Sequence, residues 1–167
     1  MKSILSRSFA TTAAAVVLAF AAPALAAKSV KVTMNAISTD GVGKSVGTIT
    51  IKESKEGITL EPKLTGLTPG EHGFHIHEKP SCDVADKEGK PAAGQAAGPH
   101  FDPDATKAHK GPGGGGHKGD LPKLVASDKG EVKDKVEVKG LKLADVQGHA
   151  LMAASSREGG SGSTARR

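Results

Sequence analysis

The chain has 167 residues and a formal net charge of +5, and it contains four Phe but neither Trp nor Tyr. This length predicts a single domain. The small charge and the lack of aromatic side chains for stacking on bases argue against a nucleic-acid-binding protein. The core must therefore be built from aliphatic side chains, and such a small domain would gain stability from a bound metal or a disulfide.

The first 26 residues have the pattern of a secretory signal peptide. Lys2 and Arg7 give a basic start, residues 9–22 are small or apolar and uncharged, and residues 23–26 read Pro-Ala-Leu-Ala, a small-x-small cleavage pattern. The alternative is a membrane anchor, but the apolar run is too short to span about 30 Å of hydrocarbon. We expect cleavage after Ala26 and export of the mature chain, with no membrane attachment afterwards.

Short segments with alternating apolar residues follow the signal peptide, and this alternation predicts β-strands. Clusters of Gly, Asp, Ser and Pro separate them, as is typical of turns. Residues 141–146 are a connector that could form one helical turn. Such a series is typical of an all-β sandwich or Greek-key barrel. The seven predicted strands cover residues 30–36, 46–51, 58–64, 73–78, 121–126, 131–138 and 148–153.

Two segments lack a strand pattern. Residues 79–122 form a long predicted loop with stretches rich in Gly and Ala, and a loop of this length in a compact domain is usually functional or disordered. Residues 155–167 contain almost no apolar side chain, so they are predicted to be a disordered tail. We therefore assign the folded domain to residues 27–154, after a signal peptide at residues 1–26.

Six of the seven histidines lie between residues 71 and 120, where they could build a metal site from nitrogen ligands. His75 and His77 are two residues apart on a predicted strand, so both side chains point to the same face of the sheet while Ile76 points to the core. A His-x-His pair alone is a weak signal for a metal site. The alternative, histidines scattered on the surface, is disfavoured by the short spacings.

A second set of potential ligands lies in the long predicted loop. It offers three nitrogens and one carboxylate, which suit a closed tetrahedral zinc site, and glycines between them let the loop fold back on itself. Taken alone, Asp120 could cap a turn and His109 could be a solvated loop residue. Metal binding would offset the entropy lost in ordering the loop. The members of the set are His100, His109, His117 and Asp120.

The order and spacing of these motifs resemble those of bacterial periplasmic copper/zinc superoxide dismutases. The motifs are GFHIHE, Cys82, AAGPHFDP, His109, GHKGDLP and GHALM, and the resemblance extends from about Val30 to Met152. It implies an eight-stranded Greek-key β-barrel in the periplasm. It also implies an enzyme that converts superoxide, a small anion, to oxygen and hydrogen peroxide.

The resemblance also implies a role for each of these histidines. His100 would bridge the two metals and act catalytically, releasing copper and taking up a proton during the reaction. His72 and His149 match family histidines that are not ligands, and we expect them to be hydrogen-bonded structural residues. The implied ligands of copper are His75, His77 and His100, and those of zinc are His100, His109, His117 and Asp120.

The chain departs from the family pattern after Met152. Two residues later, where the family has its fourth copper ligand, a histidine, this chain has Ala154. The second cysteine, a charged loop with a linking Asp, the channel arginine and the eighth strand are also unmatched, although Arg166 could be a remnant of that arginine. We therefore expect about seven strands with the eighth missing, and an open sheet edge that favours a homodimer or aggregation. Cys82 would be free, paired between chains or orphaned.

Two functions remain open from the sequence alone. The first is a superoxide dismutase whose activity is reduced by the altered C-terminal part. The alternative is a non-enzymatic module of the same fold that binds zinc and holds copper weakly. A third and remoter possibility is a fragment that does not fold by itself.

Overall fold

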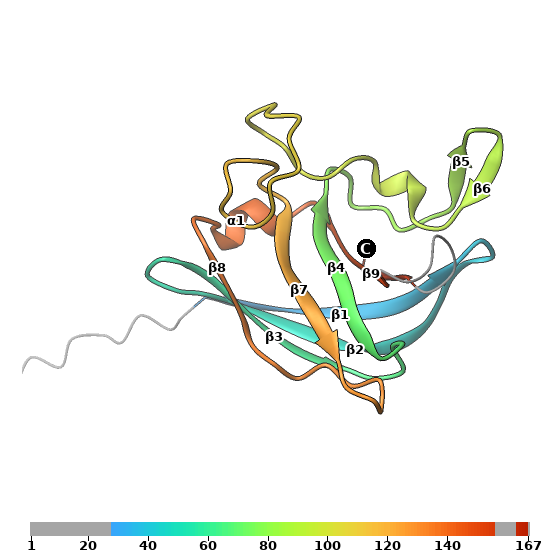
Figure 1. Ribbon diagram of the computed structural model, residues 1–167, viewed down its shortest axis with the longest axis horizontal. Coiled ribbons are helices and arrows are strands. Elements are labelled where there is room, and N and C mark those ends of the chain that lie inside the picture. Colours follow the sequence, from blue (N-terminus) through green and yellow to red (C-terminus); the bar gives the residue numbers. More distant parts are fainter. Residues whose placement is uncertain (1–27, 156–162, 167) are drawn as a thin grey trace, which may run out of the picture.

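The computed structural model describes residues 28–155 and the backbone of residues 163–166, and the regular secondary structure of these residues is almost entirely β-strand (Figure 1). Eight strands form one sheet in the order β7-β4-β9-β10-β1-β2-β3-β8. Two further strands pair in a small hairpin. The strands are β1 (Ser29–Ser38), β2 (Gly41–Glu53), β3 (Gly57–Leu64), β4 (Gly70–His77), β5 (Ala85–Lys87), β6 (Lys90–Ala92), β7 (Asp120–Ala126), β8 (Val136–Lys139), β9 (Ala150–Ser155) and β10 (Ser163–Arg166).

The large sheet is folded over so that its two halves enclose the core, with β4 and β7 lying across β1, β2 and β3 in Figure 1. All neighbouring strands are antiparallel. Chain order and sheet order differ, because the chain leaves β3 in one half and enters β4 in the other. Strands β7 and β8 are the two edges of the sheet. The predicted all-β sandwich is therefore confirmed.

The core is aliphatic, as the composition predicted. Along β3 the side chains at positions 58, 60, 62 and 64 are buried while their neighbours are more exposed, which is the alternation of a strand with one face inward. Phe74 on β4 is fully buried among Ile, Leu and Val side chains. Each such Leu or Ile contributes about 1.5–3 kcal/mol through burial, so the core holds the strands that carry the histidines.

Most of the predicted strands are confirmed. The predictions that correspond to β1, β2, β3, β4 and β7 differ from the structure by at most five residues at either end. Strand β9 lies two residues later than predicted, and the one-turn helix is present as α1 (Leu143–Val146). The strand predicted over 131–138 is only partly right, because Val132 forms an isolated bridge with Leu64 before β8 begins at Val136.

The expectation that the eighth strand is missing is wrong. Strand β10 lies between β1 and β9 and pairs with both, and Ser155, expected in a disordered tail, belongs to β9. The sequence did not reveal β10 because its pairing uses backbone N–H and C=O groups, which polar residues supply as well as apolar ones. Strand β10 also covers the edge beside β9 on which the expectation of a homodimer rested.

The long loop between β4 and β7 is more ordered than predicted. It contains the β5–β6 hairpin and a 3-10 turn, η1 (Gln95–Ala97). Backbone hydrogen bonds from Lys79 N to Ala97 O and from Ala150 N to Lys79 O tie it to β9. Cys82, itself a residue of this loop, is buried in a small apolar cluster with Ile37, Ala97 and Ala150. Packing and backbone hydrogen bonds therefore anchor the first part of the loop.

The predicted signal peptide, residues 1–26, lies outside the described residues, as do residues 156–162 and Arg167. Within the part of the chain that the structure describes, no helix is both long and apolar enough to cross a membrane.

Candidate metal centre

Three backbone hydrogen bonds join the three segments that carry the predicted ligands. Ile76 N donates to Gly119 O at 2.9 Å, Phe101 N donates to Ile76 O at 2.8 Å, and Gly119 N donates to Phe101 O at 2.8 Å. Each of these three residues directly neighbours a predicted metal ligand in the chain. The backbone therefore brings strand β4 and two distant parts of the loop together without any contribution from the ligands themselves.

Gly119 is required at this junction. A Cβ atom at this position would collide with the carbonyl oxygen of Ile76 and the amide nitrogen of Phe101. Both are backbone atoms already engaged in the three hydrogen bonds, so neither can move aside without loosening the junction. Sequence reasoning missed this role, although a glycine directly before a candidate ligand is a signal for close backbone approach.

The three histidines among the predicted zinc ligands converge on the carboxylate of the fourth, Asp120, which is only 5% exposed. Asp120 Oδ1 lies 3.0 Å from His100 Nδ1 and 3.6 Å from His117 Nδ1, and Oδ2 lies 3.2 Å from His109 Nδ1. The Nδ1 atoms of His109 and His117 are 3.0 Å apart. Three imidazole nitrogens from separate parts of the loop thus surround one buried carboxylate.

This arrangement fits a metal ion. Asp120 Oδ2 is buried and accepts no hydrogen bond, although His109 Nδ1 lies 3.2 Å from it. Leaving a buried carboxylate oxygen without a partner is unfavourable unless a cation balances it. Three nitrogens and one oxygen are a donor set typical of zinc. The loop group is therefore a candidate zinc site.

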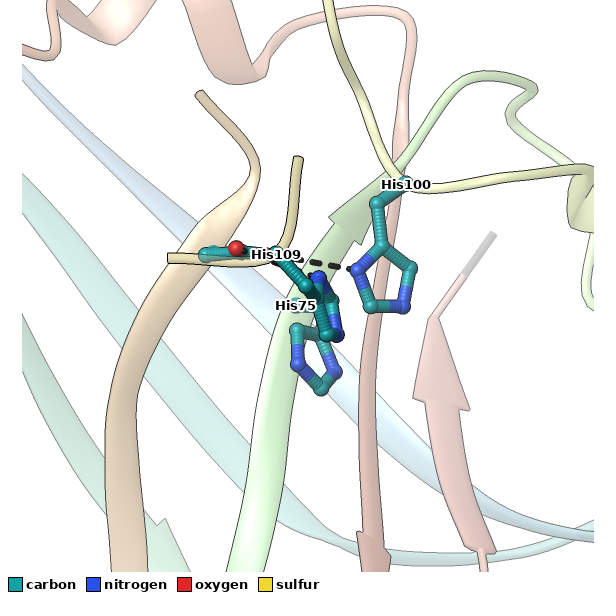
Figure 2. A group of neighbouring side chains, drawn as sticks. His75, His100 and His109 are labelled. Carbon is teal, nitrogen blue, oxygen red and sulfur yellow. Dashed lines mark hydrogen bonds and ion pairs between the residues drawn. The ribbon is translucent and has the colours of Figure 1, made fainter. Parts of the chain in front are cut away.

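His75 also approaches this group. Figure 2 shows the rings of His75, His100 and His109 gathered beside β4, and the donor atoms of these three residues and Asp120 all lie within 4.8 Å of one another. The His75 and His100 rings stack with their centroids 3.9 Å apart. The distances of His117 to Asp120 and His109 place it in the same group. Sequence reasoning had assigned His75 to copper alone, whereas the structure also places it beside the zinc ligands.

The remaining predicted copper ligand is held by the backbone. His77 Nδ1 donates to Gly98 O at 2.8 Å, and because a carbonyl oxygen only accepts, this bond leaves the lone pair on Nε2. The ring centroids of His77 and His100 are 4.9 Å apart, and those of His75 and His77 are 6.4 Å apart. The predicted copper ligands His75, His77 and His100 are therefore neighbours, with Ile76 buried between the two strand histidines as predicted.

Strand β9 supplies the opposite part of this face. Its register pairs Ala150 with His77, Met152 with His75 and Ala154 with Gly73. Directly paired residues of antiparallel strands point to the same side of the sheet. The face that carries His75 and His77 therefore continues onto β9 with two alanines and a methionine, and Ala154 stands on it as the sequence comparison with the family implied.

Burial keeps these histidines neutral. Desolvation, followed by the neighbouring His100 imidazole, lowers the pKa of His75 to about 4. Desolvation also lowers the pKa of His77 and of His100, against the opposing effects of the Gly98 carbonyl and the Asp120 carboxylate. Neutral imidazole is the form that binds metals, so all three side chains are ready to act as ligands near neutral pH.

The two histidines expected to be structural are hydrogen-bonded, as predicted. His72 is 1% exposed, and its Nε2 donates to Thr68 O at 2.8 Å. His149 Nδ1 donates to Glu78 O at 2.8 Å, and its ring packs against Phe101 with centroids 4.3 Å apart. The contact with Phe101 was not predicted, and it links the residue directly before β9 to the residue that follows His100.

Comparison with known proteins gives consistent matches in sequence and in structure. Residues 45–162 match the family model described as copper/zinc superoxide dismutase (SODC). Superoxide dismutase [Cu-Zn] of Escherichia coli K12 is 49% identical over 127 residues, which are 75% of this chain and 73% of that protein. The solved structure of Cu/Zn superoxide dismutase from Brucella abortus has a TM-score of 0.77 and 38% identity, covering 83% of this chain and 99% of that one. The monomeric copper, zinc superoxide dismutase from Salmonella enterica has a TM-score of 0.72 and 39% identity over the same shares.

Proposed function

Because this chain belongs to the copper/zinc superoxide dismutase family, we propose that it converts superoxide to oxygen and hydrogen peroxide at a centre that holds both metals. The members of this family are enzymes, and their cofactors are copper and zinc. What is proposed beyond membership is the activity of this particular chain and the part that each residue plays. The fourth copper ligand of the family is replaced by Ala154, so we propose an activity below that of a complete centre.

The observation that carries the proposal is the buried oxygen of Asp120 that accepts no hydrogen bond although three imidazoles surround the carboxylate. His100, His109, His117 and Asp120 would hold zinc, which has no redox chemistry and suits a structural site. Zinc would balance the carboxylate charge and fix the loop segments that carry the histidines. The backbone hydrogen bonds around Gly119 already hold these segments close to β4, so little rearrangement is needed.

His75, His77 and His100 would hold copper, which supplies one-electron redox chemistry when bound. The hydrogen bond from His77 Nδ1 to Gly98 O orients the ring and selects Nε2 as its ligand atom. His100 Nδ1 lies beside Asp120, which leaves Nε2 for the copper side. We propose that His100 is the catalytic residue, and that its Nε2 takes up a proton in one half of the reaction and delivers it in the other.

The alternative function is a zinc-binding module without dismutase activity. It is favoured by the face of β9, where Ala150, Met152 and Ala154 offer no nitrogen or oxygen ligand opposite His75 and His77. In that case the loop group would bind zinc fully and the copper half would bind its ion weakly. The two functions share the fold and the zinc site, and they differ in copper occupancy and turnover.

Metal analysis combined with a dismutase assay separates these functions. We expect the purified mature chain, loaded with both metals, to contain zinc and copper and to exceed an equal concentration of free copper in dismutase rate. Substituting His77→Ala should reduce copper content and rate together while zinc content stays the same. One zinc, no copper and a rate equal to that of free copper would favour the binding module.

We also propose that the protein is exported to the periplasm. Support comes from the N-terminal pattern, in which a basic start is followed by an apolar segment and the Ala24-Leu25-Ala26 cleavage motif. N-terminal sequencing of the protein from a periplasmic extract should give Ala27 as the first residue. Recovery of the chain only from the cytoplasm, with residues 1–26 retained, would contradict export.

A further inference from the structure

Strand pairing places His75 directly opposite Asp120. The register of β4 and β7 pairs these two residues, and directly paired residues of antiparallel strands point to the same side of the sheet. The carboxylate of the proposed zinc ligands is therefore fixed beside a histidine that the family pattern assigns to copper. This neighbour is set by the pairing of the two strands, so it does not depend on how the long loop folds.

The donor atoms themselves gather into a set of four that includes His75. One donor atom from each of His75, His100 and His109 (Figure 2) and one from Asp120 all lie within 4.8 Å of one another. In a tetrahedral site with zinc bonds of about 2.0–2.1 Å, the donors are about 3.3 Å apart. Small movements of the side chains would therefore bring these four donors onto a single ion.

Two cavities adjoin the Asp120 carboxylate, and they are lined by different histidines. One of about 210 Å³ is lined by Asp120 together with His75 and His109. The other, of about 230 Å³, is lined by Asp120 together with His117. The buried Oδ2 atom of Asp120 accepts no hydrogen bond, which is unfavourable unless a cation balances it. An ion on this carboxylate therefore has room for a further histidine donor on either side, His75 or His117.

The two histidines differ in how the backbone holds them. His117 directly follows residues 111–116, of which five are Gly, and its N–H donates to Ala108 O at 2.9 Å to close this part of the loop. Glycine loses more conformational freedom on ordering than any other residue. His75 lies within strand β4, which is ordered by its pairing with β7 and β9. Binding zinc through His75 therefore requires less ordering of the chain than binding it through His117.

We propose that His75 is an alternative zinc ligand, which takes the place of His117 in a chain that holds zinc but no copper. The inference rests on the proposed function, since it keeps His100, His109 and Asp120 as zinc ligands. Structural zinc sites take four donors, and the chain offers five. A neutral imidazole has one lone pair for a metal, so His75 serves one ion at a time. Zinc and copper therefore compete for His75, and zinc alone occupies part of the copper half.

The experiment measures the zinc affinity of the copper-free mature chain by competition with a zinc chelator. The variants are His117→Ala alone and His117→Ala combined with either His75→Ala or His77→Ala. We expect His117→Ala to lose less than about tenfold in zinc affinity, because His75 supplies the fourth donor, and the added His75→Ala to cost at least about tenfold more. His77→Ala is the matched control, since His77 lies on the same face of the same strand, and it should add no loss.

Histidine ring nitrogens report zinc binding directly in nuclear magnetic resonance spectra. In the copper-free chain, isotope-labelled at its histidine nitrogens, one equivalent of zinc should shift a ring nitrogen of His75 as strongly as one of His109. The shift should appear in the wild type and in His117→Ala. The ring nitrogens of His77 should keep their metal-free resonances, because His77 is not a zinc ligand. A purely structural role of His75 would not produce such a shift.

Three results would overturn the inference. The first is equal zinc affinity of His117→Ala with and without His75→Ala. The second is a loss from His77→Ala as large as that from His75→Ala, because a general weakening of strand β4 would then be responsible. The third is a His75 ring that zinc does not shift. Failure of the proposed function looks different, since Asp120→Asn and His109→Ala would then leave zinc affinity unchanged as well.

Discussion

The proposed zinc group (His100, His109, His117 and Asp120) and the proposed copper group (His75, His77 and His100) are built from different kinds of structure. The three histidines of the proposed zinc group come from a glycine-containing loop, and they surround the buried carboxylate of Asp120, the first residue of β7. The copper group starts from two histidines on strand β4, and its completion depends on what the neighbouring strand presents. A loop can fold its own ligands around an ion, whereas a strand has fixed side-chain directions and needs a donor from its partner. One substitution in a partner strand can therefore leave a strand-based site incomplete.

The largest effect should come from removing the charge at the centre of the zinc group. Substituting Asp120→Asn should weaken zinc binding by more than the roughly 10–100-fold typical of residues beyond the direct ligands. The reason is that a neutral amide cannot balance the ion in this buried position. Zinc affinity measured by chelator competition checks this, with Asp104→Asn in the same loop as the matched control. Equal zinc affinity of Asp120→Asn and the wild type would show that Asp120 is not a ligand.

The second largest effect is expected at the proposed copper group. Substituting Ala154→His should tighten Cu(II) binding about tenfold or more, and should raise dismutase turnover by a smaller factor. Binding needs only the added ligand, while turnover in the family also relies on a channel arginine and a linking Asp that this chain does not match. Copper affinity and dismutase rate are measured on the same preparations. If copper affinity and dismutase rate rise by the same factor, the four ligands alone limit turnover.

A smaller effect tests how the loop prepares the zinc group before metal binds. Asp102 accepts hydrogen bonds from Thr106 Oγ1 at 3.0 Å and from Lys107 N at 2.8 Å. On either side of Thr106, Ala105 and Lys107 have positive φ angles of 50° and 51°, which are unfavourable for residues with a Cβ. Substituting Asp102→Ala should weaken zinc binding by up to about tenfold, since both hydrogen bonds that hold this part of the loop are lost.

Rescue distinguishes this role from a general loss of stability. Asp102→Asn retains acceptor capacity and should lose less zinc affinity than Asp102→Ala. Adding Ala105→Gly to Asp102→Ala relieves the strained φ angle and should recover part of the loss. If neither change recovers zinc affinity, Asp102 does not act by holding the loop.

The smallest expected effect is on the stability of the fold, and it concerns an ion pair on the other half of the sheet. Glu61 lies 2.7 Å from Lys52 Nζ and 2.9 Å from Lys135 Nζ, and these two ammonium groups lower its pKa from 4.5 to about 2. A carboxyl with a lowered pKa in the folded state stabilises the fold above pH 4.5. That contribution is lost as pH falls from 4.5 toward 2.

Urea unfolding of the metal-free chain across this pH range checks the contribution of Glu61. Glu61→Gln should flatten the fall of the unfolding midpoint between pH 4.5 and 2, and the metal-free form removes the separate effect of histidine protonation on metal binding. Glu56→Gln, which removes the exposed ion pair with Lys139, is the matched control. A fall in Glu61→Gln as steep as that in the wild type would exclude this ion pair as its cause.

Sequence patterns alone predicted a large part of the fold and the type of each ligand set. The alternation along β4 placed His75 and His77 on one face and Ile76 in the core, because side-chain direction in a strand follows from local covalent geometry. The same rule located β1, β2, β3 and β7. The spacing of the loop histidines around Asp120 indicated a nitrogen-rich zinc site, since donor type is a property of the side chain itself.

Only the tertiary structure decided how these parts meet. The hydrogen bonds among Ile76, Phe101 and Gly119, and the pairing of β10 with β1 and β9, are made by backbone atoms that every sequence carries. No side-chain pattern indicates these backbone contacts, so the eighth strand was not predicted. The stacking of His75 on His100 and the position of Ala154 on the histidine face also depend on which distant segments become neighbours. Local geometry sets the direction of a side chain, and long-range backbone pairing sets what it faces.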